Sequence, residues 1–350
     1  MINLDFESLR PIGLTPYISQ RLLMQESENP ASFAARIIEI HRDRLVLHNG
    51  KNELTARSIA HSEHNTFAVG DWVIAEPCDN KEFRICSRIE PVTEITRRTQ
   101  NGSCQHLVSN VDTALLVMGL DNDFNLRRME RYLTIVQAAH VTPVIVLTKR
   151  DLVSDADEKL EQVRQRLPVH ITSYALNSHE QEAAITLAPW LNPGQTLVLL
   201  GSSGAGKSTL TNRLTSSQQQ TGHVRASDGR GRHTTTSRSL HVSEQGACII
   251  DTPGLRAWSP DIDEDSLDLA FDDIASLARN CKFRNCQHKD EPGCAVRGII
   301  DDDRLKNYQK LLREIKRGQQ TALERIEERA KWKLLHKAGE ARTREKRQGH

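Results

Sequence analysis

Residues 201–208 read Gly-Ser-Ser-Gly-Ala-Gly-Lys-Ser, which fits the phosphate-loop pattern G-x-x-x-x-G-K-[S/T]. An apolar run at 196–200 precedes the loop and a helix-forming run at 208–214 follows it. The glycines let backbone N–H groups converge on phosphates, and the start of the helix adds positive potential. Lys207 is expected to contact the β- and γ-phosphates of a nucleotide, and Ser208 to ligate Mg²⁺.

Two further motifs choose between adenine and guanine nucleotides. Asp-Thr-Pro-Gly at 251–254 ends a hydrophobic strand, where Asp251 can hold Mg²⁺ through water and the Gly254 N–H can contact the γ-phosphate. Thr-Lys-Arg-Asp at 148–151 ends another such strand. Asp151 can accept two hydrogen bonds from guanine, and the Lys149 stem can cover the base. On its own the 148–151 motif is weak, because a charged surface turn reads the same way.

The order of these motifs is unusual. In ordinary GTPases the phosphate loop comes first, whereas here the base-reading loop precedes it and the 251–254 loop follows it. Apolar strands at 111–120, 142–148, 169–176, 195–200 and 247–251 alternate with helical stretches, including an amphipathic one at 125–140 with Leu126, Met129, Leu133 and Val136 on one face. This alternation predicts a parallel sheet covered on both faces. The sequence therefore predicts a circularly permuted α/β P-loop GTPase domain.

The residues before this domain have a β pattern. Residues 31–100 hold several short apolar runs separated by turns, and Asn49-Gly50 predicts a two-residue hairpin with positive φ at both turn positions. A five-stranded barrel of the OB type fits the length, and so does an ordinary β-domain without a nucleic-acid role. Residues 1–30 have no clear periodicity and are expected to form a loose or partly helical arm.

Four potential metal ligands follow the permuted domain with the spacing Cys281-x4-Cys286-x-His288-x5-Cys294. Three thiols and one imidazole are a standard closed zinc set, which indicates a structural rather than a catalytic ion. The alternative, a group of buried cysteines, is weak because the segment is polar. The four other cysteines, which are scattered, are expected to be small buried hydrophobic residues: Cys78, Cys86, Cys104 and Cys248.

The charge is distributed unevenly. The formal net charge is +1, but residues 301–350 carry 15 Lys and Arg against 9 Asp and Glu. A basic end indicates a polyanionic partner, although a solvated helix with many charges would look the same. The chain has neither an apolar run of membrane-spanning length nor a secretory signal pattern, so a cytoplasmic protein is expected.

Residues 229–240, rich in glycine and arginine, lie where a first switch belongs. Thr234 and Thr235 are the candidates for contacting Mg²⁺ and the γ-phosphate, and the sequence does not separate them. The predicted magnesium ligands are Ser208, Asp251 and, from this pair, Thr235.

In these motifs and their order the chain resembles the circularly permuted ribosome-assembly GTPases called RsgA or YjeQ. The resemblance covers nearly the whole sequence and includes the β-rich start, the 148–151, 201–209 and 251–254 motifs, the 229–236 switch and the Cys/Cys/His/Cys cluster. It implies a protein that binds the small ribosomal subunit and its rRNA late in maturation. Its slow GTP hydrolysis would be stimulated by the subunit and would help to release the protein itself and other assembly factors.

The resemblance also implies which residues bind the ligands. Zinc would be held by Cys281, Cys286, His288 and Cys294. GTP would be held by Thr148, Lys149, Asp151, Gly201, Ser202, Ser203, Gly204, Ala205, Gly206, Lys207, Ser208 and Thr209, together with the switch residues above.

Two positions depart from the usual GTPase pattern. Thr148 stands where Asn usually bridges the base and the phosphate loop, so somewhat weaker nucleotide binding is expected, with guanine preference kept by Asp151. Leu255 stands where many GTPases place a water-orienting Gln. His233 is the candidate to position that water and, with Lys207, to act in catalysis; an ordinary exposed switch residue is the equal alternative.

The sequence thus predicts a monomer of four segments: an arm (1–30), an OB-like β-barrel (31–100), a permuted GTPase (101–260) and a zinc-binding helical domain with a basic tail (261–350). Three functions remain open. They are a switch GTPase, a GTP-independent RNA-binding scaffold with a degenerate nucleotide site, and a P-loop kinase or ATPase. A nucleotide-gated RNA-binding protein with a different polyanionic partner is the alternative to the small-subunit GTPase. Intact Lys207, Ser208, Asp151 and Asp251 argue against a degenerate site.

The candidate RNA contacts are the barrel, Arg225, Arg230, Arg232, Arg342, Arg344, Lys346 and Arg347.

Overall fold

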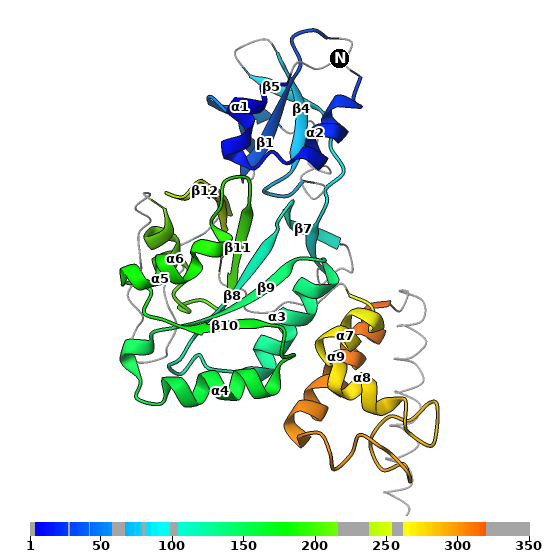
Figure 1. The fold of residues 1–350 in the computed structure, drawn as a ribbon. Helices are drawn as coiled ribbons and strands as arrows, with labels where there is room; N and C mark the ends of the chain where they lie inside the picture. The colour runs from blue at the N-terminus through cyan, green and yellow to red at the C-terminus, as the bar shows by residue number, and fades with distance from the viewer. Residues whose placement is uncertain are drawn as a thin grey trace, which may run out of the picture.

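The computed structural model describes residues 4–26, 29–41, 43–57, 67–78, 82–98, 104–215, 238–253 and 262–319. An N-terminal barrel, a central sheet with helices on both faces and a C-terminal helical group follow one another along the chain (Figure 1). Within these ranges no helix is long and apolar enough to cross a membrane.

The N-terminal strands close into a five-stranded barrel. The strands are β1 (Phe33–Ile40), β2 (Arg44–His48), β3 (Glu53–Arg57), β4 (Trp72–Pro77) and β5 (Phe83–Arg88). Their order is β1-β2-β3-β5-β4, and the β1–β4 pairing closes the ring. Alternate residues of the strands, among them Ile37, Leu47 and Val73, fill the interior. The predicted OB-like barrel is confirmed.

The β2–β3 hairpin differs in detail from the prediction. Asn49 pairs with Asn52, so the two turn residues are Gly50 and Lys51. Only Gly50 has a positive φ (90°), whereas Asn49 caps the turn by accepting the N–H groups of Lys51 and Asn52 on its side chain. A glycine at the first central position is the preference of a type II′ turn. Because the Asn49 side chain bonds to the backbone of the turn, Asn49 precedes the turn, and the turn lies one residue later than predicted.

The N-terminal arm is helical and packed in its described part. It forms α1 (Phe6–Leu9), the 3₁₀ turn η1 (Arg10–Ile12) and α2 (Pro16–Leu23). Thr15 caps α2 and Pro16 starts it, which is a standard helix beginning. Leu9, Ile18 and Leu22 pack with Trp72 and other barrel residues in one buried cluster.

The central sheet has the predicted α/β architecture. Its strands are β8 (Thr113–Gly119), β9 (Thr142–Thr148), β10 (Thr172–Ala175), β11 (Thr196–Gly201), β12 (Ser239–Val242) and β13 (Cys248–Asp251), in the order β10-β9-β8-β11-β13-β12. All pairings are parallel except that of β12. The main helices are α3 (Leu126–Ala138), α4 (Ala156–Arg166), α5 (Gln181–Leu187) and α6 (Lys207–Leu214), with short 3₁₀ turns η4 (Arg150–Leu152) and η5 (Ala188–Trp190).

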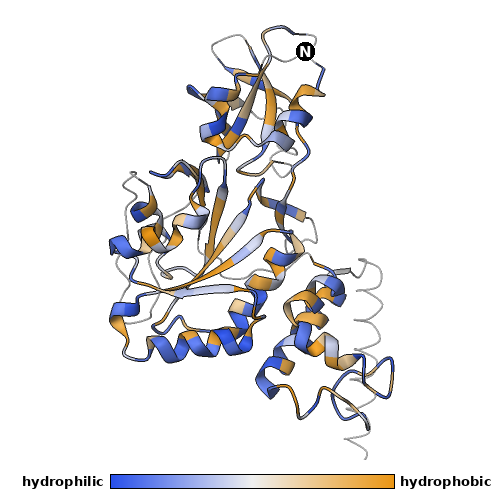
Figure 2. Cartoon of the chain, in the orientation of Figure 1, coloured by the Kyte–Doolittle hydropathy of each residue, from blue (hydrophilic) through white to orange (hydrophobic). Residues whose placement is uncertain are grey.

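Two separate apolar layers show that the sheet is covered on both faces. Met129 and Leu133 of α3 belong to one layer, and Leu187 of α5 and Leu210 of α6 belong to the other. Figure 2 shows the strands of the sheet as largely hydrophobic and α4, at the border of the molecule, as largely hydrophilic. The predicted face of α3 is correct, since Met129, Leu133 and Val136 are fully buried.

Two connections were not predicted. The hairpin β6 (Glu94–Arg98) and β7 (Cys104–Ser109) joins the barrel to the central sheet. Strand β12, which follows the switch segment in sequence, also pairs with barrel strand β1 at Ser239 and Glu39. The barrel and the central sheet therefore share backbone hydrogen bonds.

The C-terminal group consists of α7 (Glu264–Ala270), α8 (Asp272–Ala278) and α9 (Asp302–Gln319). Leu267 of α7, Leu311 of α9 and Phe271, which lies between α7 and α8, pack into the same buried layer as α3.

The expectation that the scattered cysteines are buried is wrong for three of the four. Cys78, Cys86 and Cys104 are exposed and only Cys248 is buried, because the first three lie at strand ends or on outward positions of strands.

Candidate nucleotide-binding and metal sites

The phosphate-loop sequence lies between β11 and α6, as its pattern requires. Gly201 cannot be replaced without movement, since a Cβ there would lie 2.2 Å from the carbonyl oxygen of Val117 on β8. Gly204 and Gly206 have φ of 81° and 93°, which L-residues rarely adopt. The glycines are therefore needed for the turn and for close packing against the sheet.

The charged residues of the loop converge. The buried Lys207 Nζ donates to the carbonyl oxygens of Gly201 (3.1 Å) and Ser202 (2.8 Å). Burial lowers the pKa of this ammonium to about 8, against the opposing effect of Asp251 and Asp123. Ser208 Oγ donates to Asp251 Oδ2 at 3.3 Å, and Asp251 ends β13 beside β11. The fold thus brings together the two described residues predicted to ligate magnesium.

The base-reading sequence follows β9 and reaches the phosphate loop. Thr148 Oγ1 donates to the carbonyl oxygen of Ala205 at 2.6 Å. The bridge that an Asn amide would supply is therefore made by a hydroxyl. Lys149 has a φ of 62° and starts the η4 turn, which carries the exposed Asp151.

Two carboxylates that the sequence analysis missed belong to this site. Asp121 and Asp123 lie in the loop between β8 and α3, at the same sheet edge as the other nucleotide loops. Asp121 Oδ2 pairs with Lys149 Nζ at 2.8 Å, and Asp123 accepts a hydrogen bond from Ser202 Oγ. The position of the loop at the carboxyl end of a buried parallel strand was the available signal.

Several predicted residues lie outside the described part of the chain. They are His233, Thr234, Thr235, Gly254, Leu255 and the arginine and lysine residues proposed for RNA contact at 225–232 and 342–347.

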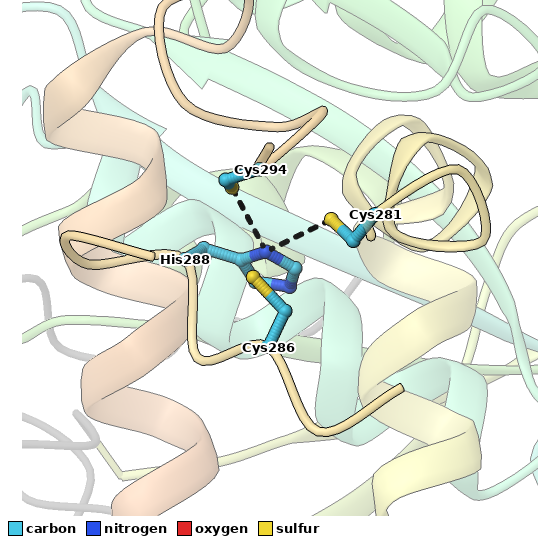
Figure 3. A group of neighbouring side chains, drawn as sticks. All are labelled: Cys281, Cys286, His288 and Cys294. Atoms are coloured by element: carbon cyan, nitrogen blue, oxygen red, sulfur yellow. Dashed lines mark hydrogen bonds between the residues drawn. The ribbon is translucent and has the colours of Figure 1, made fainter. Parts of the chain in front are cut away.

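The cysteine–histidine cluster comes together as predicted. The donor atoms of Cys281, Cys286, His288 and Cys294 all lie within 4.8 Å of one another (Figure 3). His288 Nδ1 lies 3.7 Å from Cys281 Sγ and 3.5 Å from Cys294 Sγ. Four soft donors converging on one point fit a tetrahedral ion such as Zn²⁺ and leave no position for water.

Backbone contacts position the ligands of this cluster. The N–H groups of Ala295 and Arg297 point at the sulfurs of Cys281 and Cys294. Gln309 of α9 donates to the carbonyl oxygens of Gln287 and His288, both at 3.2 Å. The loop is thereby attached to the helix that packs on the central domain.

The comparisons with known proteins agree with this architecture. Residues 89–260 match the model of the RsgA GTPase family. The RsgA 2 small ribosomal subunit biogenesis GTPase of Vibrio vulnificus is 39% identical over 317 residues, covering 88% of each chain. The corresponding RsgA of Xanthomonas campestris is 41% identical over 302 residues, covering 82% of each chain.

Two solved structures share the fold. YjeQ from Thermotoga maritima aligns with a TM-score of 0.59 at 22% identity and covers 81% of this chain and 98% of its own. YloQ, described as a circularly permuted GTPase, aligns with a TM-score of 0.56 at 24% identity and covers 85% of this chain and 99% of its own. With the permuted motifs at one sheet edge and relatives near 40% identity over most of the chain, this protein belongs to the RsgA family of small ribosomal subunit biogenesis GTPases and is a GTP hydrolase.

Proposed function

We propose that this GTP hydrolase binds the small ribosomal subunit and its rRNA during late maturation. Hydrolysis stimulated by the subunit then releases the hydrolase itself and other assembly factors. The observation that carries the proposal is the meeting of Thr148, Lys207 and Asp251 at one edge of the central sheet, in a chain with relatives named for small-subunit biogenesis. We place the protein in the cytoplasm as a monomer.

In the proposed site each loop has one task. Gly201 through Thr209 surround the phosphates, with Lys207 neutralising the charge between the β- and γ-phosphates. Asp151 pairs with guanine while Lys149 covers the base. Ser208, Asp251 and Thr235 would hold Mg²⁺, which would supply charge stabilisation at the phosphates. Thr234 and Gly254 contact the γ-phosphate, and His233 orients the attacking water.

The test is GTP turnover by the purified chain with and without small subunits, with ATP and large subunits as controls. We expect strong stimulation by small subunits alone, loss of turnover in Lys207→Ala, and loss of stimulation in His233→Ala. Turnover that ignores ribosomes would leave a GTPase with another polyanionic partner. A His233→Ala protein with full stimulation would remove only the water-orienting role.

We propose further that the Cys281, Cys286, His288 and Cys294 cluster holds one structural Zn²⁺. Its role is to fix a polar loop that has little apolar area of its own. Cys286→Ser is expected to lower the zinc content from one per chain toward zero and to raise hydrogen exchange in α9. The matched control is Cys78→Ser, an exposed cysteine of the barrel, which should leave both measurements unchanged. A Cys286→Ser protein that keeps its zinc would contradict the assignment.

A further inference from the structure

The loop between β8 and α3 contacts the phosphate loop through Asp123. The Ser202 hydroxyl lies 2.6 and 2.7 Å from the two carboxylate oxygens of Asp123, and this carboxylate is only 16% exposed. Two groups orient it. The Gly119 N–H donates to Oδ2 at 3.2 Å, and the Arg128 guanidinium pairs with Oδ1 at 2.5 Å. The Asp123 carboxylate is therefore also held by groups other than the serine.

The same loop contacts the base-reading loop through Asp121. Its Oδ2 pairs with Lys149 Nζ at 2.8 Å, and its Oδ1 accepts the N–H of Asp123 at 3.2 Å. A Cβ on Gly119 would lie 2.5 Å from Asp121 Oδ1, so a glycine is required for the carboxylates to take these positions. One short loop thus joins the two nucleotide loops.

Ser202 also holds the catalytic lysine. Its carbonyl oxygen accepts from Lys207 Nζ at 2.8 Å while its hydroxyl is directed to Asp123. The contact with Lys207 uses the backbone of Ser202 and the contact with Asp123 uses its side chain, so loss of the Asp123 contact loosens the phosphate loop while the backbone contact of Lys207 remains. Without Asp123, the loop that surrounds the phosphates would have to become ordered when the nucleotide binds. The entropy lost in that ordering would lower the affinity for the nucleotide.

We propose that Asp123 is a positioning residue of the nucleotide site, which holds the phosphate loop through Ser202 and, with Asp121, sets its distance from the base-reading loop. This inference rests on the proposed nucleotide site. It assigns Asp123 to nucleotide affinity and not to the hydrolytic step, because its carboxylate contacts Ser202, Gly119 and Arg128.

The test measures the affinity for a fluorescent GDP and the kcat and KM for GTP in Asp123→Ala, Asp123→Asn, Ser202→Ala and the double variant Asp123→Ala with Ser202→Ala. We expect Asp123→Ala and Ser202→Ala each to weaken GDP binding and raise KM by about tenfold, with kcat within about twofold. Asp123→Asn should have a smaller effect, since one acceptor oxygen remains. The double variant should be no weaker than either single one, because both remove the same hydrogen bond.

The control is Glu158→Gln, which removes an exposed carboxylate from α4 and should bind GDP as the unchanged protein does. Effects that add in the double variant, or normal GDP affinity in folded Asp123→Ala and Asp123→Asn, would overturn the inference. If Asp123→Ala does not fold, Asp123→Asn and Ser202→Ala still decide. Absence of GDP binding in the unchanged protein would instead reject the nucleotide site itself.

Discussion

At the scale of single residues, Lys207 has the most informative environment. Its ammonium is buried and its pKa is lowered to about 8 from the ordinary 10.5, chiefly by loss of solvation. In the proposed nucleotide site, a bound phosphate would supply the opposite charge at close range and would raise the pKa of Lys207 again. Protonation and nucleotide binding are therefore linked.

The sign of this linkage gives a pH prediction. At pH 9 most of the free protein carries a neutral Lys207, whereas the complex carries the charged form, so GDP binding should take up close to one proton. At pH 7 both forms are charged and uptake should be near zero. GDP affinity should accordingly fall as the pH rises above about 8. Calorimetry in buffers of different ionisation enthalpy measures the uptake, and binding heats at pH 9 that do not depend on the buffer would contradict the prediction.

Base selection is a second prediction for one residue. The Asp151 carboxylate is expected to accept two hydrogen bonds that only guanine offers, so Asp151→Ala should reduce the preference for GTP over ATP by at least about tenfold. Thr148→Ala tests the bridge to Ala205 and should weaken both nucleotides alike. Competition of ATP against a fluorescent GDP measures both. Equal competition by ATP and GTP in the unchanged protein would refute the role of Asp151.

At the scale of elements, a buried ionic network attaches the C-terminal helices to the central domain. Glu130 of α3 is fully buried and accepts hydrogen bonds from Arg166 Nε of α4 (2.8 Å), Arg304 of α9 (2.7 Å) and the Asn307 side chain of α9. Arg304 also pairs with Asp273 of α8. These bonds to Asp273 and Glu130 raise the pKa of Arg304 despite its burial. Three helices, α3, α4 and α9, meet at the Glu130 carboxylate, and α8 joins them through Arg304.

Removing that carboxylate should release the helical group. Glu130→Ala leaves the buried Arg304 and the partly buried Arg166 without their shared partner, so we expect a loss of about 3–5 kcal/mol in local stability. The control is Glu314→Ala. Glu314 of α9 pairs with Arg131 of α3 at a more exposed position, so this variant should lose under about 1 kcal/mol of stability. Hydrogen exchange of the α9 amides measures the loss of local stability in both variants. Similar protection in the two variants would show that apolar packing alone holds α9.

At the scale of the whole molecule, Arg36 joins the arm, the barrel and the central sheet. This fully buried guanidinium donates to the carbonyl oxygens of Ile12 (2.7 Å), Gly70 (3.1 Å) and Asn110 (3.0 Å) and to Thr196 Oγ1 (3.0 Å). Burial lowers its pKa, but arginine keeps its charge. Thr196 begins the strand that ends in the phosphate loop, so the junction lies at the amino end of β11, opposite the phosphate loop.

Arg36→Lys tests this junction. A lysine keeps the charge but has one nitrogen in place of the planar fork, so buried carbonyl oxygens lose their donors. We expect a loss of about 3–5 kcal/mol, seen as a lower Tm. The matched control is Arg44→Lys, at an exposed position of the same barrel, with a Tm shift within about 1 °C. An Arg36→Lys protein with unchanged Tm would mean that the apolar cluster around Trp72 carries the junction.

Much of the architecture could be predicted because local patterns agree with the tertiary contacts. The buried strands at β8, β9, β11 and β13 have continuous apolar runs, and the amphipathic face of α3 matches its buried side. The short strand β12, the β6–β7 hairpin and α7 and α8 were missed, because their periodicity is brief and their pairing depends on distant segments. The division at residues 30, 100 and 260 stays a prediction.

The sequence by itself determined the chemistry of this protein. Gly201 through Ser208, the Asp251 motif and the Cys3His spacing can be recognised in the sequence, because each chemistry requires particular residue types at short spacing. The weaker Asp151 motif gains its meaning from the other two nucleotide motifs in the same domain. Only the tertiary structure decided how they are joined. Asp123 on Ser202, Thr148 on Ala205, Glu130 under α9 and Arg36 between the domains connect residues distant in sequence, and such contacts depend on the path of the whole chain, which no local pattern records.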